Sequence, residues 1–126
     1  VYNGKFKSSN HYFTNNPISY DIYDGPTVST TYTFEEIVES KINGSFGASL
    51  SGISAELGFN VSTAKKYIKQ IILEGLTDDQ KLKVSVFGLY DKYSFDVYSL
   101  FGSYKGTGYA YKPMGIYIKQ EIYSKK

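Results

Sequence analysis

Several residue types on which catalytic and metal-binding proteins depend are scarce or missing in this sequence. Its 126 residues contain no cysteine, no tryptophan and no arginine, and His11 is the single histidine. The absence of cysteine excludes a disulfide scaffold, a thiol nucleophile, an iron–sulfur cluster and every cysteine-based zinc site. One histidine leaves almost no room for a histidine-built metal site or a Ser-His-Asp triad. We therefore expect no enzymatic activity, no metal and no cofactor.

No stretch of the chain approaches the roughly 20 apolar residues that a helix needs to cross a bilayer. Tyrosine and lysine are abundant instead, with 14 Tyr and, because arginine is absent, 14 Lys. A preference for Lys, Tyr, Asn and Ile follows from AT-rich coding, which indicates a low-GC bacterial source. The chain starts at Val1, as a processed exported protein or an excised segment does. The lack of cysteine favours a secreted or cell-surface location.

Most of the sequence alternates apolar and polar residues with a period of two, which is typical of half-buried strands. The clearest runs are 18–23, 28–34, 81–86, 93–98 and 116–123. They are joined without long helical crossovers, which favours antiparallel pairing. The polar residues 8–17 predict a loop, and the glycine-rich stretch 102–108 predicts a flexible connector. The sequence thus predicts a mainly β single domain, 1–126, built as an antiparallel sheet or sandwich.

The middle of the chain departs from this alternation, and we expect at most one or two short helices in 48–74. Within 62–73 the apolar residues recur at i, i+3, i+4, i+7 and i+8, with Ser62 placed as an N-cap and Gly75 as a C-terminal stop. On local evidence this is the strongest helix of the chain. Three consecutive β-formers at 71–73 keep a strand open as the alternative.

The segment 53–76, ISAELGFNVSTAKKYIKQIILEGL, resembles a bacterial helix-turn-helix with Gly58 in its turn. The resemblance implies a winged-helix DNA-binding protein as an alternative function. The residues that face the major groove and its phosphates would be Ser62, Thr63, Lys65, Lys66 and Lys69. Residues 64–126 carry eleven lysines against six acidic residues, a balance that suits an anionic partner, although scattered lysines usually form only a solvated face. Against this alternative, the chain lacks the arginine that makes the commonest specific contact to guanine.

A second pattern covers much more of the chain. It consists of GFNVS at 58–62 after a Ser/Thr-rich alternating region, YSFDVY at 93–98 and GTGYAYKPMG at 106–115. This pattern is similar to a class of small exported β-proteins of Gram-positive bacteria. The resemblance implies a β fold and export, and it implies no catalytic residue. We therefore favour an exported, non-enzymatic β-domain with a binding or surface-interaction role.

Membrane action is a second alternative. The Ser/Thr alternation at 28–33 and the small residues at 44–54 resemble the amphipathic hairpin of aerolysin-type β-pore toxins. Such a hairpin needs two uninterrupted runs of roughly 9 to 11 residues. Glu35, Glu36 and Glu39 interrupt the apolar face, which counts against this alternative.

Tyrosine is the one enriched side chain with functional chemistry. A rigid apolar ring with a polar tip suits contacts with a protein, a carbohydrate or a cell-surface ligand. Core packing and cross-strand aromatic pairs explain the same enrichment without a ligand. The candidate ligand-binding residues lie in the last third of the chain and are Tyr90, Tyr93, Tyr98, Tyr104, Tyr109, Tyr111 and Tyr117.

Overall fold

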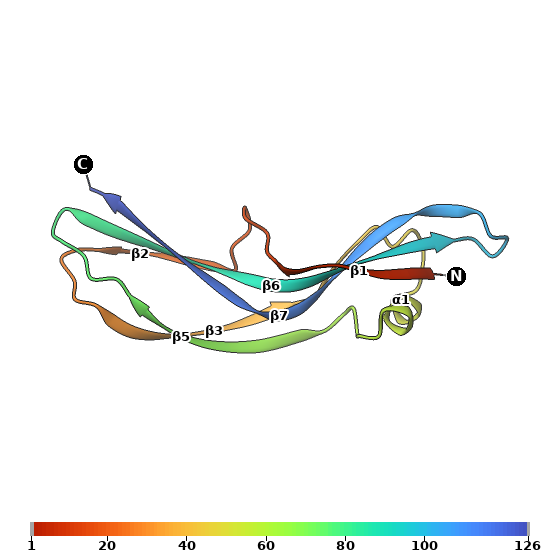
Figure 1. Cartoon of the computed structure of the whole chain (residues 1–126), viewed down its shortest axis with the longest axis horizontal. Helices are drawn as coiled ribbons and strands as arrows, with labels where there is room; N and C mark the ends of the chain where they lie inside the picture. Colours follow the sequence, from red (N-terminus) through yellow and green to blue (C-terminus); the bar gives the residue numbers. More distant parts are fainter. Residues whose placement is uncertain (1, 126) are drawn as a thin grey trace. The chain divides into compact units, whose positions relative to one another are not determined.

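The computed structural model describes residues 2–125, and of Tyr2 only the backbone. One helix, α1 (Leu50–Leu57), accompanies seven strands: β1 (Tyr2–His11), β2 (Ser19–Asp24), β3 (Thr30–Glu39), β4 (Lys41–Asn43), β5 (Ala64–Leu73), β6 (Gln80–Tyr98) and β7 (Tyr104–Ser124) (Figure 1). The strand pairs of the main sheet run antiparallel. The chain is therefore mainly β with one short helix in the described part of 48–74, which confirms the fold class that the alternation predicts.

The chain forms two compact units. Unit 1 contains the described residues up to His11 together with Glu39–Lys65 and Leu89–Met114. Unit 2 contains Tyr12–Val38, Lys66–Gly88 and the described residues from Gly115 onward. The long strands β6 and β7 contribute residues to both units. The single domain and the sandwich stay predictions.

In unit 1 the sheet has the strand order β1-β6-β7-β4, and α1 packs against it. Gly4 of β1 lies opposite Phe95 of β6, and Ile42 of β4 lies opposite Ala110 of β7. The buried core joins the helix to the sheet and consists of Ile53, Val61, Phe95, Val97 and Ala110. Burial of this apolar surface is what holds α1 on the sheet.

Small residues of β7 make room for this packing. A Cβ atom on Gly108 would lie 2.3 Å from the carbonyl oxygen of Gly44 and 2.5 Å from the ring of Phe95. A Cβ atom on Gly106 would lie 2.5 Å from the ring of Phe46. The glycines of the Gly-x-Gly-x-Ala element at 106–110 therefore allow these rings to pack closely on β7, because a larger side chain would push the rings away from the strand.

The helix α1 has a cap at each end. Ser49 is its N-cap, and the Ser49 hydroxyl accepts a hydrogen bond of 3.1 Å from the backbone N–H of Gly52. Gly58 ends the helix in the left-handed region with a φ of 81°, a conformation that glycine adopts without steric cost. Within the described part of the chain, no helix has both the length and the apolar character needed to cross a membrane.

Unit 2 contains a sheet with the strand order β2-β6-β7 and a two-stranded sheet made of β3 and β5. Hydrogen bonds join the two sheets: the Ser19 hydroxyl donates to Glu36, and the Gln120 amide donates to the carbonyl of Ile72. Both sheets contribute to the buried apolar residues, which include Phe34, Val38, Leu73, Leu82, Val84, Val86 and Ile116. Paired faces of this kind bury the apolar half of each alternating strand.

The local prediction of a helix within 62–73 is wrong, because residues 64–73 form β5. The strand leaves Ile68 and Ile72 each 65% exposed, while Leu73 is buried. Strand β5 pairs with β3, and Lys66 binds Glu35 of that strand at 2.8 Å. The β-branched residues of this segment suit an extended backbone, so the tertiary partner overrides the helical period.

Three smaller expectations also change. Residues 8–11 of the predicted loop belong to β1, and Tyr104 to Gly108 of the predicted connector belong to β7. The run 18–23 does contain a strand, but its apolar residues Tyr20 and Ile22 are exposed rather than buried. A period of two locates a strand without stating which of its faces meets the core.

Candidate functional site

Five of the seven predicted tyrosines lie on one face of the unit 1 sheet, the face opposite α1. We call this surface the tyrosine face and define it by Tyr90, Lys92, Asp96 and Tyr98 of β6 and by Tyr104, Thr107, Tyr109 and Tyr111 of β7. Alternation along β6 places residues 90, 92, 96 and 98 on the same side of the sheet, away from Phe95 and Val97, which pack under α1. Cross-strand contacts bring the residues of β7 to the same side.

Ring contacts connect the tyrosines of the two strands. The ring centroids of Tyr90 and Tyr111 are 6.0 Å apart, and those of Tyr98 and Tyr104 are 5.7 Å apart, both in edge-to-face geometry. Such aromatic pairs contribute about 0.5–1.5 kcal/mol beyond their area burial. Part of the tyrosine enrichment therefore serves the sheet itself.

Burial divides these tyrosines into structural and accessible residues. Tyr90 and Tyr111 are buried, and the Tyr90 hydroxyl donates a hydrogen bond of 3.0 Å to the carbonyl of Glu39. Burial, and secondarily the charge of Glu39, raises the pKa of Tyr90 above its usual value. Tyr98 and Tyr109 are half-buried and Tyr104 is exposed, so these three rings can meet a ligand.

Lys92 places a positive charge beside two rings of the tyrosine face. The Lys92 ammonium lies 4.5 Å from the ring centroid of Tyr109 and 5.9 Å from that of Tyr111. A cation over an aromatic face is attracted by the negative face of the ring, which orients the Lys92 side chain along the sheet surface. His11 packs 5.1 Å from Tyr111, and partial burial, followed by the charge of Lys92, lowers the pKa of His11 below its usual value of about 6.5. His11 is therefore neutral at physiological pH.

A negative group lies on the same strand. Thr107 donates a hydrogen bond of 2.6 Å to the carboxylate of Asp96. Because this donation uses the one proton of Thr107, the 2.6 Å contact between Tyr104 and Thr107 has the Tyr104 hydroxyl as donor. Tyr104, Thr107 and Asp96 thus form an ordered chain of hydrogen bonds. The tyrosine face offers stacking rings, one cation and one carboxylate, which can bind a polar ligand.

The other two predicted tyrosines lie elsewhere. Tyr93 is on the α1 side of the unit 1 sheet, with its ring 5.5 Å from Phe6 and 5.1 Å from Phe59. Tyr117 belongs to unit 2, where its ring lies 5.0 Å from that of Tyr12. Both residues make packing contacts away from the tyrosine face.

The residues predicted for DNA binding are not arranged as on a recognition helix. Ser62 and Thr63 precede β5, and the Thr63 carbonyl accepts a hydrogen bond of 2.8 Å from the backbone N–H of Ser40. Lys65, Lys66 and Lys69 lie on β5, where residues 66 and 69 point to opposite sides of the strand. The winged-helix alternative needs a recognition helix in this segment, but the structure has strand β5 there. The fold therefore does not favour that alternative.

The segments assigned to a pore hairpin also differ from two paired strands. Residues 44–49 have no regular secondary structure, and residues 50–54 belong to α1. In the structure, Ile53 of the segment 44–54 is buried in the core of unit 1.

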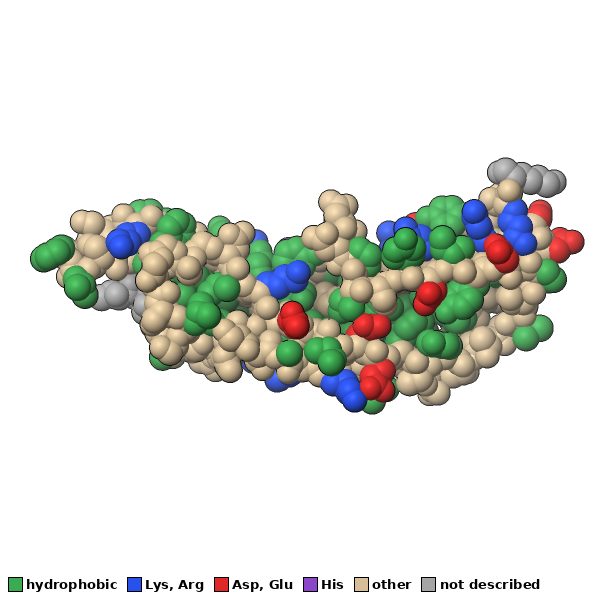
Figure 2. Space-filling model, turned by 180° about the vertical axis from the view of Figure 1, so that it is seen from behind, with side chains coloured by type: hydrophobic (Ala, Val, Ile, Leu, Met, Phe, Trp, Pro, Cys, Tyr) green, Lys and Arg blue, Asp and Glu red, His purple; other side chains and the backbone are tan. Residues whose placement is uncertain are grey.

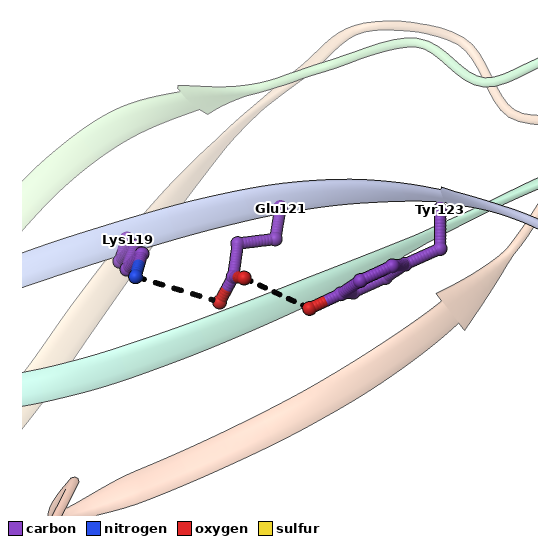
Figure 3. A network of polar contacts seen from close by, with 3 residues as sticks. All are labelled: Lys119, Glu121 and Tyr123. Carbon is purple, nitrogen blue, oxygen red and sulfur yellow. Dashed lines mark hydrogen bonds and ion pairs between the residues drawn. The ribbon is translucent and has the colours of Figure 1, made fainter. Parts of the chain in front are cut away.

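The structure reveals a further lysine–tyrosine cluster that the sequence analysis missed. Ile22, Lys81, Lys83 and Tyr123 of unit 2 line an open depression of about 290 Å³. Figure 3 shows that the Tyr123 hydroxyl donates to Glu121, at 2.8 Å, and that Lys119 lies 3.9 Å from the same carboxylate. The hydrogen bond to Glu121 is the main cause of a raised pKa of Tyr123. In the sequence, the signal for this cluster was the pair Lys81 and Lys83, which lie two residues apart and so share one face of β6.

No grouping of three or more His, Asp or Glu side chains suited to a metal ion occurs within residues 2–125. The Glu35 carboxylate pairs with Lys66 at the surface. A scan against protein-family models matches none of them, and the search of curated proteins gives no significant match.

Proposed function

We propose that the protein is an exported, non-enzymatic binding protein whose tyrosine face takes a carbohydrate of a bacterial cell surface. The observation that carries this proposal is the combination of three accessible tyrosines, Tyr98, Tyr104 and Tyr109, with Lys92 and Asp96 on one sheet face. Tyrosine rings stack on the apolar faces of sugar rings, and their hydroxyls exchange hydrogen bonds with sugar hydroxyls.

The polar groups of the tyrosine face suit a sugar chain with charged substituents. Lys92 is available to a carboxylate or a phosphate, and the Asp96 carboxylate accepts hydrogen bonds from hydroxyl or ammonium groups. A sheet face presents an extended surface, which matches a chain of several sugars better than a single small metabolite. The cysteine-free composition supports export, and the low-GC composition supports a Gram-positive source.

Retention on insoluble peptidoglycan from a Gram-positive bacterium, with chitin as a second polysaccharide, tests this function. We expect the wild type to sediment with at least one of the two and the double variant Tyr104→Ser, Tyr109→Ser to lose at least about 10-fold in affinity. The matched control is Tyr20→Ser, Tyr123→Ser, which removes two exposed tyrosines of unit 2. Equal retention of both double variants, or no retention of the wild type on either polysaccharide, would contradict the proposal.

A further inference from the structure

The turn that joins β6 to β7 carries the most exposed large hydrophobic side chains of the described chain. Leu100 is fully exposed, at 102%, and Phe101 is 96% exposed. Figure 2 shows hydrophobic side chains protruding at the end of this hairpin. Isolated surface apolar residues are common, but two adjacent ones that no other described residue covers indicate an interaction site.

The turn itself has no need of these two side chains. Its backbone is closed by the hydrogen bond from the Ser99 N–H to the Ser103 carbonyl and by the hydrogen bond from the Gly102 N–H to the Ser99 carbonyl. The Ser99 hydroxyl accepts a further hydrogen bond from the N–H of Ser103. Gly102 supplies the left-handed φ of 84°. Small polar residues are the usual choice between such positions, so Leu100 and Phe101 have no role in forming the turn.

The closed backbone also suits entry into an apolar medium. Unpaired backbone N–H and C=O groups cost several kcal/mol each in hydrocarbon, which keeps most loops out of lipid. In the Ser99–Ser103 turn, the hydrogen bonds named above pair the N–H groups of Ser99, Gly102 and Ser103. These hydrogen bonds lower the backbone cost of placing the turn at a bilayer interface.

The surroundings of the turn have the composition of a membrane-facing tip. Tyr98 and Tyr104 flank it as an edge-to-face pair, and Tyr and Trp are the residues that concentrate at membrane–water interfaces. Phe46 of unit 1 is 43% exposed and lines an open depression together with Leu100 and Lys105. Residues 43–52 and 97–108 contain no Asp or Glu and one cation, Lys105. Both segments therefore lack the carboxylates that a lipid interface disfavours, and the carboxylate of Asp96, just before the second segment, accepts a hydrogen bond from Thr107.

We propose that the β6–β7 hairpin is a membrane-interface anchor that inserts Leu100 and Phe101 among lipid acyl chains and keeps Tyr98, Tyr104 and Lys105 at the headgroup level. A lipid bilayer fits better than a protein partner, because it accepts a narrow protruding tip without a complementary pocket. A stable protein–protein contact usually buries about 800 Å² on each partner, which two side chains cannot supply. Lys105 and the absence of carboxylates favour bilayers that contain anionic lipid.

This anchor goes beyond the proposed function and does not depend on it. Burial of a leucine and a phenylalanine gives less affinity than a myristoyl chain, whose own binding constant of about 10⁴ M⁻¹ is only marginal. The anchor therefore acts reversibly and concentrates the protein at a membrane instead of fixing it there. The variants that test it leave Tyr104 and Tyr109 unchanged, so failure of the anchor and failure of carbohydrate binding are separate results.

The absence of tryptophan from the sequence provides a site-specific reporter. In Phe101→Trp the single indole occupies the tip, and in Ile68→Trp it occupies an exposed position on β5 in unit 2. With vesicles of phosphatidylcholine and phosphatidylglycerol in equal parts, we expect the emission of Phe101→Trp to shift to shorter wavelength and to be quenched by brominated acyl chains. Ile68→Trp should show neither change. No shift for Phe101→Trp, or an equal shift for both variants, would overturn the proposal.

Vesicle co-sedimentation measures the contribution of the tip. We expect Leu100→Ser, Phe101→Ser to weaken binding by at least about 100-fold relative to the wild type, because both side chains lose their transfer to lipid. The matched control Ile68→Thr, Ile72→Thr removes two exposed apolar side chains from β5 and should bind as the wild type does. A circular dichroism spectrum and a thermal midpoint for each variant show that the fold is retained. Wild-type binding by the tip variant would overturn the proposal.

Two further measurements separate the anchor from other roles of the same residues. Sedimentation velocity without lipid detects self-association, and a dimer that the tip variant abolishes while vesicles bind neither protein would overturn the proposal in favour of a second copy as partner. Dye release from the same vesicles separates anchoring from pore formation. Binding with intact vesicles supports the anchor, whereas release that persists in the tip variant would contradict it and would favour the pore alternative.

Discussion

Gly108 of β7 lies directly against the ring of Phe95 of β6, so close that a Cβ atom at residue 108 would stand 2.5 Å from that ring. Phe95 is itself fully buried in the core under α1. The lack of a side chain at residue 108 leaves the space that the Phe95 ring occupies. It also explains why a larger residue at the second glycine of the Gly-x-Gly-x-Ala element should lower the stability of the fold.

Gly108→Ala should destabilise the protein by about 1–3 kcal/mol, because the added methyl group overpacks a filled core. Gly115→Ala is the matched control on the same strand, since a Cβ atom there meets nothing within 4 Å. Urea unfolding followed by circular dichroism gives both free energies of unfolding. A Gly108→Ala variant as stable as Gly115→Ala would show that Phe95 does not pack against residue 108.

Tyr90→Phe should lower the free energy of unfolding by about 1 kcal/mol at neutral pH, because the Glu39 carbonyl loses its hydrogen bond from the phenol. The same substitution should alter the alkaline behaviour. The pKa of Tyr90 is raised in the folded state, so its contribution is fully present below about pH 10 and is lost as the pH rises through the folded-state pKa.

Urea unfolding across the alkaline range measures this effect. The free energy of unfolding of the wild type should fall more steeply above about pH 10 than that of Tyr90→Phe. Tyr20→Phe, which alters an exposed phenol, serves as control and should follow the wild type. Identical slopes for the wild type and Tyr90→Phe would be inconsistent with a buried, hydrogen-bonded phenol at residue 90.

Ser49→Ala should cost about 1 kcal/mol of stability, because the N–H of Gly52 loses its capping acceptor at the start of α1. Ser51→Ala lies two residues further on in the helix and should be neutral or slightly stabilising, since alanine is the better helix former. Thermal unfolding compares the two variants. Equal losses in both would argue against Ser49 as the cap.

Replacement of Lys65, Lys66 and Lys69 by alanine should change neither duplex-DNA binding nor the fold appreciably. The three lysines lie on a strand, and Lys66 makes an exposed ion pair with Glu35, which contributes little stability. A duplex titration at low salt compares the triple variant with the wild type. Micromolar or tighter binding that disappears in the variant would favour the winged-helix alternative despite the fold.

Period-two alternation determined the β class and located parts of four strands, β2, β3, β6 and β7, because the alternation of side chains along an extended backbone is a local property. The sequence also limited the helical content to 48–74 and singled out the tyrosines. The sequence predicted loops at 8–11 and at 104–108, where the structure has strands. Glycine and polar residues have weak local preferences, so pairing with neighbouring strands decides their conformation.

Only the tertiary structure decided how these elements are used. Residues 64–73 satisfy a helical period as well as a strand, and pairing with β3 made them β5. Alternation could not tell which face of a strand meets the core, so it did not distinguish the accessible Tyr104 from Tyr93, which packs against Phe6 and Phe59. The exposure of Leu100 and Phe101 likewise appears only once β6 and β7 close their hairpin. The burial of a side chain depends on residues that are distant in the sequence. A local pattern of polarity does not show which distant residues will pack against it.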